Sequence, residues 1–309
     1  MKKTIFYFAL LFIGFVSCQK NTNSQTTEIT KKGLLWQISG KGVKTSYLYG
    51  TMHVSNEKVI KLSDMAMDEL DKCQVMAGEL VLKESDMMPM MMSLFMKDTT
   101  LEMLLSPSEY QIVHKKLEEK MGFMATMLEK IKPVFISVML TEQANNGSEK
   151  EGKKPASIFD KISDKSNKKL PLDMYLQEKA KDKGKEVVGL ETVEEQLSAF
   201  NTITLKEQAK MLYETVISEN KAEGQSLEGM LDLYYRQEID SLYMLTNQAL
   251  SSNSNNKLII ERNTNMADRM EKIMKEKSLF TAVGAAHLAG KTGLIDLLRK
   301  RGYQVTVVK

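Results

Sequence analysis

The chain has 309 residues, of which 42% are hydrophobic and 27% are charged. This composition is typical of a soluble globular protein, and it excludes collagen-like repeats, disorder over most of the length and a multi-span membrane protein. Lys and Arg number 43 against 40 Asp and Glu, which gives a net charge of +3, so the charge balance does not predict binding to nucleic acid.

Residues 1–17 have the pattern of a bacterial lipoprotein signal peptide. Two lysines precede an apolar run of 12 residues, which is shorter than the ~20 residues that span a bilayer. The run ends in a small residue followed by Cys18, as in a lipobox, although Phe15 replaces the usual Leu. We predict cleavage before Cys18, lipid attachment to its thiol and a location in the cell envelope, at the periplasmic face or the outer membrane. The alternative is an ordinary secretory signal.

The remaining chain predicts strands near both ends and helices between them. Residues 18–32 are polar and predict a flexible tether. Alternating or apolar runs predict strands at 34–39, 45–49, 74–77, 186–190, 279–283 and 304–308. Helical spacing predicts helices at 64–72, 172–183, 257–275 and 292–300. Two longer stretches, 83–168 and 193–250, are predicted to be mostly helical, and Pro89, Pro107 and Pro133 interrupt the first of them. Polar loops are predicted at 145–157 and 251–256.

This order of elements predicts an α/β fold in a single domain over 33–309. Strand–helix alternation at both ends indicates a mixed sheet assembled from 33–84 and 271–309. The intervening residues 85–270 are predicted to be mostly helical, with one strand near 186–190.

Two of the predicted strands run into the same Gly-x-x-His pattern. Gly50 and His53 follow the strand at 45–49, and Gly284 and His287 follow the strand at 279–283. Glycine lets the chain turn sharply, and ligands in open α/β sheets bind outside the carboxyl ends of the strands. We therefore expect the two imidazoles to lie at one edge of the sheet.

Two further predicted strands end in a carboxylate. Glu79 follows Gly78 directly, and Glu191 follows Gly189 by two residues. Imidazole and carboxylate are good ligands for Zn, Mn, Co or Fe(II), and an ion with an open coordination position activates water for hydrolysis. The same four side chains without a metal would serve as acid and base, and this alternative stays open.

Four other features predict structure rather than a site. Cys73 lies in an apolar stretch and is predicted to be a buried small hydrophobe, with no disulfide partner once Cys18 is lipidated. His114 lies among charged residues and is predicted to be solvated. Six methionines within Met87–Met96 favour an adaptable apolar helix face over a copper site. Residues 284–292 resemble a phosphate loop, but five residues separate its glycines where that motif has four.

The chain resembles the TraB/PrgY/GumN family, to which the eukaryotic TIKI proteases belong. The resemblance is carried by the two Gly-x-x-His motifs, by 184–192 and by Glu261-Arg262-Asn263, and it covers about 33–309. It implies an EreA/ChaN-like architecture and a membrane-tethered hydrolase that depends on a divalent metal (Mn, Co or Zn), such as a peptidase with a peptide or protein substrate.

The resemblance also assigns residues to the site, matching the family's motif histidines to His53 and His287, its acidic positions to Glu79 and Glu191, and its Arg-Asn pair to Arg262 and Asn263. We expect the histidines and glutamates around the metal, and a general base in place of a ligand is the alternative role for one of the two glutamates. Arg262 would hold a substrate carboxylate or an oxyanion, with Asn263 as a donor. A distantly similar group of haem-binding lipoproteins leaves a second hypothesis open, a protein that binds peptide or haem without catalysis.

Overall fold

The computed structural model describes residues 32–40, 42–54, 56–145, 170–218, 227–248 and 256–308. The chain divides into two compact units. The sheet unit comprises the described residues of Gly14–Val81, Lys169–Ala199 and Glu223–Lys309, and the helical unit those of Leu82–Lys168 and Phe200–Ala222. The predicted signal peptide, Cys18, most of the predicted tether and nearly all of the two predicted polar loops lie outside the described residues.

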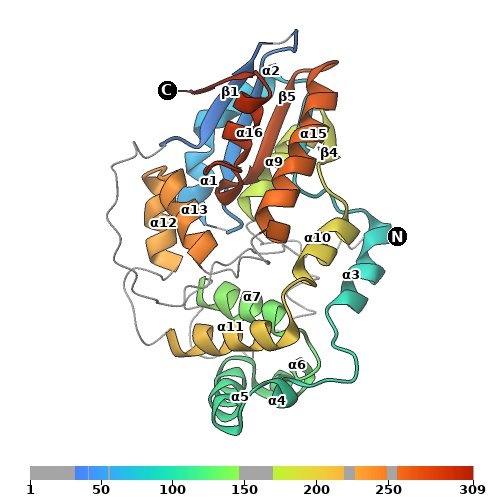
Figure 1. Cartoon of the computed structure of the whole chain (residues 1–309), viewed down its shortest axis with the longest axis vertical. Helices are drawn as coiled ribbons and strands as arrows, with labels where there is room; N and C mark the ends of the chain where they lie inside the picture. Colours follow the sequence, from blue (N-terminus) through green and yellow to red (C-terminus); the bar gives the residue numbers. More distant parts are fainter. Residues whose placement is uncertain are drawn as a thin grey trace. The chain divides into compact units, whose positions relative to one another are not determined.

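The sheet unit is built on a six-stranded mixed sheet with the strand order β4-β3-β5-β2-β1-β6. Its strands are β1 (Leu35–Ser39), β2 (Ser46–Thr51), β3 (Val75–Gly78), β4 (Glu186–Gly189), β5 (Leu279–Gly284) and β6 (Gln304–Val307). The four strands β2, β5, β3 and β4 run parallel, and β1 is antiparallel to both of its neighbours. Figure 1 shows the blue strand β1, from the N-terminal part of the chain, in the same sheet as the orange-red strand β5, from its C-terminal part. The predicted α/β class with a mixed sheet is confirmed.

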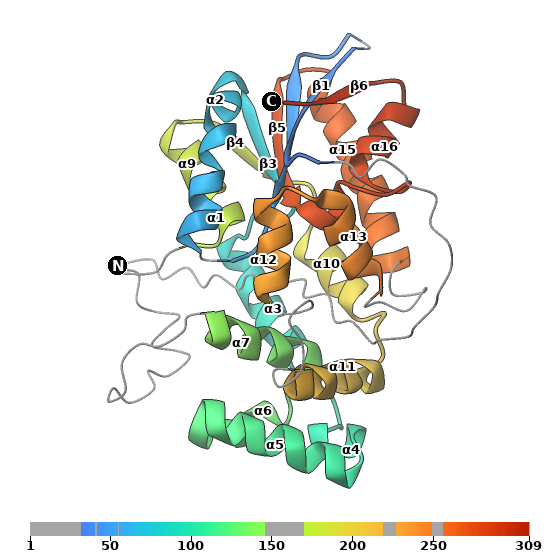
Figure 2. The same ribbon diagram turned by 90° about the vertical axis from the view of Figure 1, so that its left-hand side faces the viewer.

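Helices cover both faces of this sheet (Figure 2). One face carries α1 (Glu57–Leu62), α2 (Asp64–Lys72) and α9 (Leu172–Asp182), and the other carries α15 (Arg262–Met274) and α16 (Leu294–Lys300). Leu172, Leu176 and Ala180 of α9 recur at helical spacing and are fully buried, because this stripe lies against the strands. The central strands β2 and β5 are buried along almost their whole length, as expected for strands covered on both sides.

The sheet unit contains further helical segments beside the strand ends. These are α10 (Val193–Phe200, whose last residue falls in the helical unit), α12 (Leu227–Tyr235), α13 (Ile239–Gln248), η3 (Asn256–Glu261) and η4 (Ala285–His287). Tyr234 in α12 is fully buried and donates a hydrogen bond from its hydroxyl to the carbonyl of Gly50 (2.8 Å). This bond ties α12 to the strand that leads toward His53.

The helical unit contains α3 (Met87–Ser93), α4 (Leu101–Leu104), α5 (Pro107–Met121), α6 (Ala125–Leu128), α7 (Pro133–Asn145) and α11 (Leu205–Ser218). Figure 2 shows α11 beside α7, against which it packs. The helical stretch is interrupted before Pro107 and Pro133, as predicted, and each of these prolines begins the next helix, because the first turn needs no backbone N–H donor. Pro89 does not interrupt the chain in this way and lies inside α3. An isolated antiparallel bridge between Phe95 and Ile131 was not predicted.

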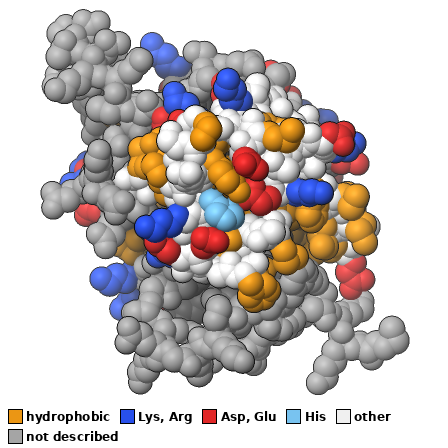
Figure 3. All heavy atoms as spheres, turned by 90° about the horizontal axis from the view of Figure 1, so that it is seen from below, with side chains coloured by type: hydrophobic (Ala, Val, Ile, Leu, Met, Phe, Trp, Pro, Cys, Tyr) orange, Lys and Arg blue, Asp and Glu red, His pale blue; other side chains and the backbone are white. Residues whose placement is uncertain are grey.

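The methionine cluster divides between the core of the helical unit and its surface. Met90 and Met96 are buried, whereas Met88 and Met92 are 67% and 68% exposed. Figure 3 shows one face of the molecule, on which hydrophobic side chains lie interspersed with acidic and basic ones. Among the described residues, no helix has the length and apolar character needed to cross a bilayer.

Candidate active site

The parallel strands bring four of the predicted site residues to one edge of the sheet. His53 lies two residues beyond β2, Glu79 directly follows β3, Glu191 lies two residues beyond β4, and His287 ends η4, which follows β5. Because these four strands run in the same direction, their carboxyl ends share one edge. Glu79 lies there within 4 Å of both histidines, which are 234 residues apart in the sequence, and Arg262 links Glu79 to Glu191.

One oxygen of Glu79 lies at the centre of this cluster. Glu79 Oε1 is 3.9 Å from His53 Nε2 and 3.8 Å from His287 Nε2, and it accepts a hydrogen bond from the backbone N–H of Gly284 (2.6 Å). Both imidazole distances exceed the length of an N–H···O hydrogen bond. The two Nε2 atoms therefore face the same oxygen across a shared space rather than bonding to it.

The other ring nitrogen of each imidazole contacts an acceptor outside that space. His287 Nδ1 lies 2.6 Å from Asn263 Oδ1, and Asn263 Nδ2 donates to the carbonyl of Thr292 (2.8 Å). With the amide oriented in this way, Asn263 Oδ1 accepts the Nδ1 proton, which leaves a lone pair on His287 Nε2. His53 Nδ1 lies 3.1 Å from Asp173 Oδ1.

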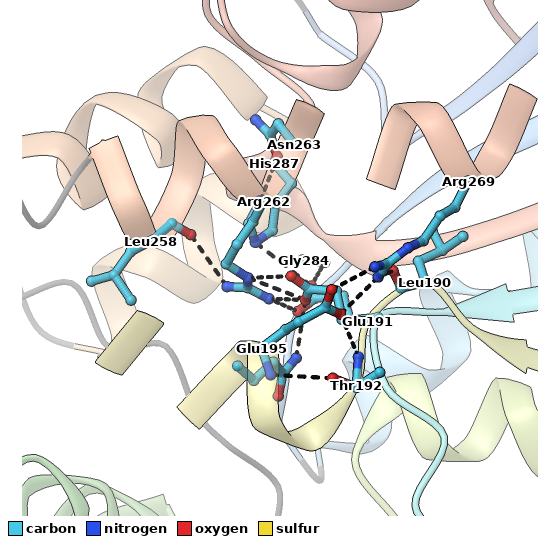
Figure 4. A network of polar contacts seen from close by, with 12 residues as sticks. Leu190, Glu191, Thr192, Glu195, Leu258, Arg262, Asn263, Arg269, Gly284 and His287 are labelled. Atoms are coloured by element: carbon cyan, nitrogen blue, oxygen red, sulfur yellow. Dashed lines mark hydrogen bonds and ion pairs between the residues drawn. The ribbon is translucent and has the colours of Figure 1, made fainter. Parts of the chain in front are cut away.

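Arg262 joins the two glutamates, and Figure 4 shows its guanidinium directed toward Glu191. Its Nη2 donates to Glu79 Oε2 (2.8 Å) and to Glu191 Oε2 (2.6 Å), its Nε donates to Glu191 Oε1 (2.8 Å), and its Nη1 donates to the carbonyl of Leu258 (3.3 Å). Arg262 and Glu191 are both buried. In this arrangement Glu191 gives both oxygens to Arg262, whereas Glu79 gives only Oε2.

The buried charges shift one another's pKa values. Burial by itself would raise the pKa of Glu79, but the neighbouring His287, His53 and Arg262 outweigh burial and hold that pKa well below its ordinary value. Burial also opposes the charged form of His53, yet Asp173 and Glu79 together raise the pKa of His53 well above its ordinary value. Burial lowers the pKa of His287 to about 4, reinforced by Arg262 and His53. Glu79 is therefore a permanent carboxylate at neutral pH, and His287 is neutral.

The glycines of the two motifs allow close approach at this edge. A Cβ atom on Gly284 would lie 3.2 Å from Glu79 Oε1, 3.6 Å from His287 Cδ2 and 3.7 Å from His53 Nε2. A Cβ atom on Gly50 would lie 3.2 Å from Ala285. Gly284 thus leaves open the space between the imidazoles and Glu79, and Gly50 lets β2 approach η4.

The donor set in this space fits a divalent ion. Two ligand atoms that bind one ion at ~2.1 Å in tetrahedral geometry lie about 3.4 Å apart. The measured separations of 3.8 and 3.9 Å are a few tenths of an ångström wider, so a small inward movement of His53 and His287 toward Glu79 would be needed. As the side chains stand, the described residues contain no group of three or more His, Cys, Asp or Glu arranged to hold a metal.

Asp173 is the contact that the sequence did not indicate. It lies in the first turn of α9, where an acidic residue is common for reasons that have nothing to do with a site. It is 120 positions from His53 in the sequence, and only the fold brings the two together. The π-helical turn η3 before Arg262 was also missed, because a continuous helix was expected there.

Two residues for which the sequence predicts no role in the site lie outside it. Cys73 is buried, and burial raises the pKa of its thiol to about 12, so the thiol is protonated and unreactive. His114 lies on α5 in the helical unit, and its Nδ1 is 3.1 Å from Glu129 Oε1. The expectation that His114 is simply solvated was wrong, since its ring is partly buried and paired with that carboxylate.

Comparison with known proteins assigns the chain to a family. The model of the TraB/PrgY/gumN family matches residues 34–307. Metalloprotease TIKI1 of Danio rerio is 24% identical over 92% of this chain, and the TIKI1 of Homo sapiens is 23% identical over 94% of it. The Metalloprotease TIKI homolog of Nematostella vectensis is 25% identical over 94% of the chain.

These relatives are longer than the chain described here. It spans 64% of the length of the Danio and human proteins and 68% of the Nematostella protein. No solved structure matches it. The family match covers nearly all of the described residues, including every residue of the cluster around Glu79. The chain therefore belongs to the TraB/PrgY/gumN family.

Proposed function

We propose that the protein is a hydrolase of peptide bonds that depends on a divalent metal and is anchored to the cell envelope by a lipid on Cys18. The observation that carries the hydrolase proposal is the convergence of His53 Nε2 and His287 Nε2 on one oxygen of Glu79. The similarity to proteins named as metalloproteases supports the metal and the substrate class. The anchor rests on the lipobox pattern before Cys18.

His53, His287 and Glu79 would hold the ion. Two imidazole nitrogens and one carboxylate suit Zn, Mn or Co and leave part of the coordination sphere open for water and substrate, and binding the ion would displace the Nε2 proton of His53. When bound, the metal would polarise a carbonyl and lower the pKa of a water molecule. Glu79 suits a ligand role because its lowered pKa keeps it ionised at neutral pH without a metal.

Arg262 and Glu191 would position Glu79. The guanidinium of Arg262 holds Glu79 Oε2, so that Oε1 is the oxygen left facing the imidazoles. Glu191 holds Arg262 from the other side through both of its own oxygens. Since the Nε and Nη2 donors of Arg262 are already engaged by the two glutamates, we assign it to positioning rather than to binding a substrate carboxylate. Asn263 has the same kind of role toward His287.

The test is metal content and peptidase activity in histidine variants purified without a metal-affinity tag. We expect elemental analysis to find a divalent ion in the wild type, and mass spectrometry of an added peptide library to detect cleavage that a chelator abolishes. His53→Ala and His287→Ala should each lose both properties, and the double variant should be no worse, because either loss already empties the site. His114→Ala is the matched control and should retain both.

Two results would reject this proposal. If both single variants keep full metal occupancy, His53 and His287 do not share an ion. If the wild type binds peptides but cleaves none of them when Zn, Mn or Co is supplied, the protein is a non-catalytic peptide binder. A coloured protein with haem absorbance would instead favour the haem-binding hypothesis.

A further inference from the structure

The two imidazoles of the site are backed by different groups. Behind His287 stands a neutral amide, Asn263, whose Oδ1 lies 2.6 Å from His287 Nδ1. Behind His53 stands a carboxylate, Asp173, whose Oδ1 lies 3.1 Å from His53 Nδ1. The nitrogen that faces Glu79 is Nε2 in both rings. The site is therefore symmetric toward Glu79 and asymmetric behind the histidines.

The packing of α9 fixes the place of Asp173. Leu172, Leu176 and Ala180 are fully buried, which anchors the helix to the sheet. Gln177 lies one turn after Asp173, and its Nε2 donates a hydrogen bond to the carbonyl of Leu80 (3.0 Å). Leu80 is the residue that follows Glu79 in the chain. Residues four apart lie on the same side of a helix, so Asp173 and Gln177 both face the strand ends that carry the site.

The environment of Asp173 Oδ1 points to His53 as its partner. This oxygen is buried and accepts no hydrogen bond of standard geometry from the described residues, and His53 Nδ1 lies 3.1 Å from it. A buried carboxylate oxygen without a partner is costly in free energy, so a fold that places one there needs a compensating contact. The close contact with His53 Nδ1 at 3.1 Å is the one that the structure provides.

We propose that Asp173 is the positioning residue of His53. By accepting the proton of Nδ1, it holds His53 in the tautomer whose Nε2 carries the lone pair, aims that lone pair at the space beside Glu79 Oε1, and makes the ring a stronger ligand than one backed by an amide. The inference rests on the proposed function in one respect only, namely that the lone pair of Nε2 then binds a divalent ion. The tautomer itself is a property of the metal-free protein at alkaline pH, where the imidazole of His53 is neutral.

The experiment compares Asp173→Asn with Asp64→Asn. Asparagine keeps the size of the side chain but removes the charge, and its amide can donate to Nδ1 and favour the other tautomer. Asp64 is the matched control, because it is an exposed first-turn aspartate in α2 and lies outside the site. Removing its charge tests the loss of a favourable helix-dipole interaction alone.

Two readouts are needed. The first is the Zn²⁺ affinity of the metal-free protein measured by calorimetry, which should fall by about 10- to 100-fold in Asp173→Asn and stay unchanged in Asp64→Asn. The second is the tautomer of each imidazole from ¹⁵N spectra at alkaline pH. With three histidines in the chain, His53 is assigned by comparison with the three His→Ala variants. We expect the Nδ1–H tautomer for His53 in the wild type and its loss in Asp173→Asn only.

The outcomes separate this inference from the proposed function. An Nε2–H tautomer for His53 in the wild type overturns the positioning role, and this result does not depend on whether Asp173→Asn folds. An unchanged Zn²⁺ affinity and an unchanged His53 tautomer in a folded Asp173→Asn variant overturn it as well. If the wild type binds no divalent ion, the proposed function fails, while the tautomer measurement still decides whether Asp173 orients His53.

Discussion

Glu79 and Glu191 stand in the same sequence context, each at the end of a parallel strand, but their side chains have different surroundings. Glu79 divides its oxygens between Arg262 and the two imidazoles. Glu191 gives both oxygens to Arg262, and one of them also accepts from Gln196 (3.3 Å). The difference predicts that Glu79 acts mainly in metal binding and that Glu191 acts mainly in stabilising the fold.

Replacing each glutamate by glutamine separates these roles. Glu79→Gln should weaken metal binding by at least about 10-fold and lower the free energy of unfolding by about 1 kcal/mol, because Arg262 keeps Glu191. Glu191→Gln leaves the buried Arg262 with one carboxylate contact and should lower the free energy of unfolding by about 3 kcal/mol. Calorimetric titration and urea unfolding measure the two quantities.

Glu194→Gln is the control for this pair, because Glu194 is exposed in the first turn of α10. Its substitution should alter metal affinity and stability little. The opposite ordering, with metal affinity more sensitive at Glu191 than at Glu79, would show that Glu191 leaves Arg262 to bind the ion.

Gly284 offers a steric test of the same space. Its φ of −51° is accessible to any residue, so Gly284→Ala introduces a methyl group without backbone strain. That methyl group would lie 3.2 Å from Glu79 Oε1 and 3.7 Å from His53 Nε2. We expect the variant to fold, as judged by circular dichroism, and to bind Zn²⁺ at least about 10-fold more weakly. Wild-type affinity would mean that the ion binds elsewhere.

At the scale of elements, an ion pair links α10 to α15. Glu195 Oε2 accepts from Arg269 Nη1 and from the backbone N–H of Thr192, both at 2.8 Å, and Arg269 also donates to the carbonyl of Leu190. The contact with Arg269 is the main reason that the pKa of Glu195 falls to about 2. This link fixes the loop that carries Glu191 between β4 and α10.

The lowered pKa predicts how this link depends on pH. A carboxyl whose pKa is lower in the folded state stabilises the fold above its unfolded pKa, and that contribution is lost as the pH falls toward about 2. Glu195→Gln should therefore reduce the free energy of unfolding at pH 7 by less than about 1 kcal/mol, because the pair is partly exposed.

Urea unfolding at a series of pH values measures this effect. The difference between the wild type and Glu195→Gln should shrink as the pH is lowered from 6 to 3. A difference that is constant over this range would show that the carboxylate charge contributes nothing and that only the shape of the side chain matters.

The elements themselves were largely predictable from local patterns. The helix expected at 64–72 is α2 with the same bounds, and the strand expected at 279–283 is β5 with one more residue. Glycine and polar punctuation marked these ends, and burial on both faces gave the strands their apolar runs. The predicted convergence of His53 and His287 followed from the rule that parallel strands share a carboxyl edge.

The contacts behind the site were not predictable in this way. Asp173 looks like an ordinary first-turn acidic residue, and its proximity to His53 follows only from how α9 packs on the sheet. The engagement of Arg262 by two glutamates likewise depends on η3 and on two separate strand ends. Such contacts arise from tertiary packing, and no local pattern of residues in a single sequence indicates them.

At the scale of the molecule, the site belongs to the sheet unit alone. Its residues come from the ends of β2, β3, β4 and β5 and from α9 and α15, all of which are in that unit. These elements are drawn from three separate stretches of the chain. We infer that the site forms only when the whole mixed sheet is assembled, so that loss of metal and loss of the sheet unit should coincide on unfolding.

The proposed lipid anchor gives the last prediction, which rests on the sequence before the described residues. Cys18→Ser removes the thiol that would carry the lipid, so the protein should leave the membrane fraction or accumulate with its signal peptide uncleaved. Cell fractionation followed by mass spectrometry of the N-terminus measures both outcomes. Cys73→Ser is the matched control, because Cys73 is buried in the sheet unit and should have no influence on anchoring. Normal cleavage with unchanged membrane retention in Cys18→Ser would refute lipidation at Cys18 and leave an ordinary secretory signal as the explanation of the N-terminal pattern.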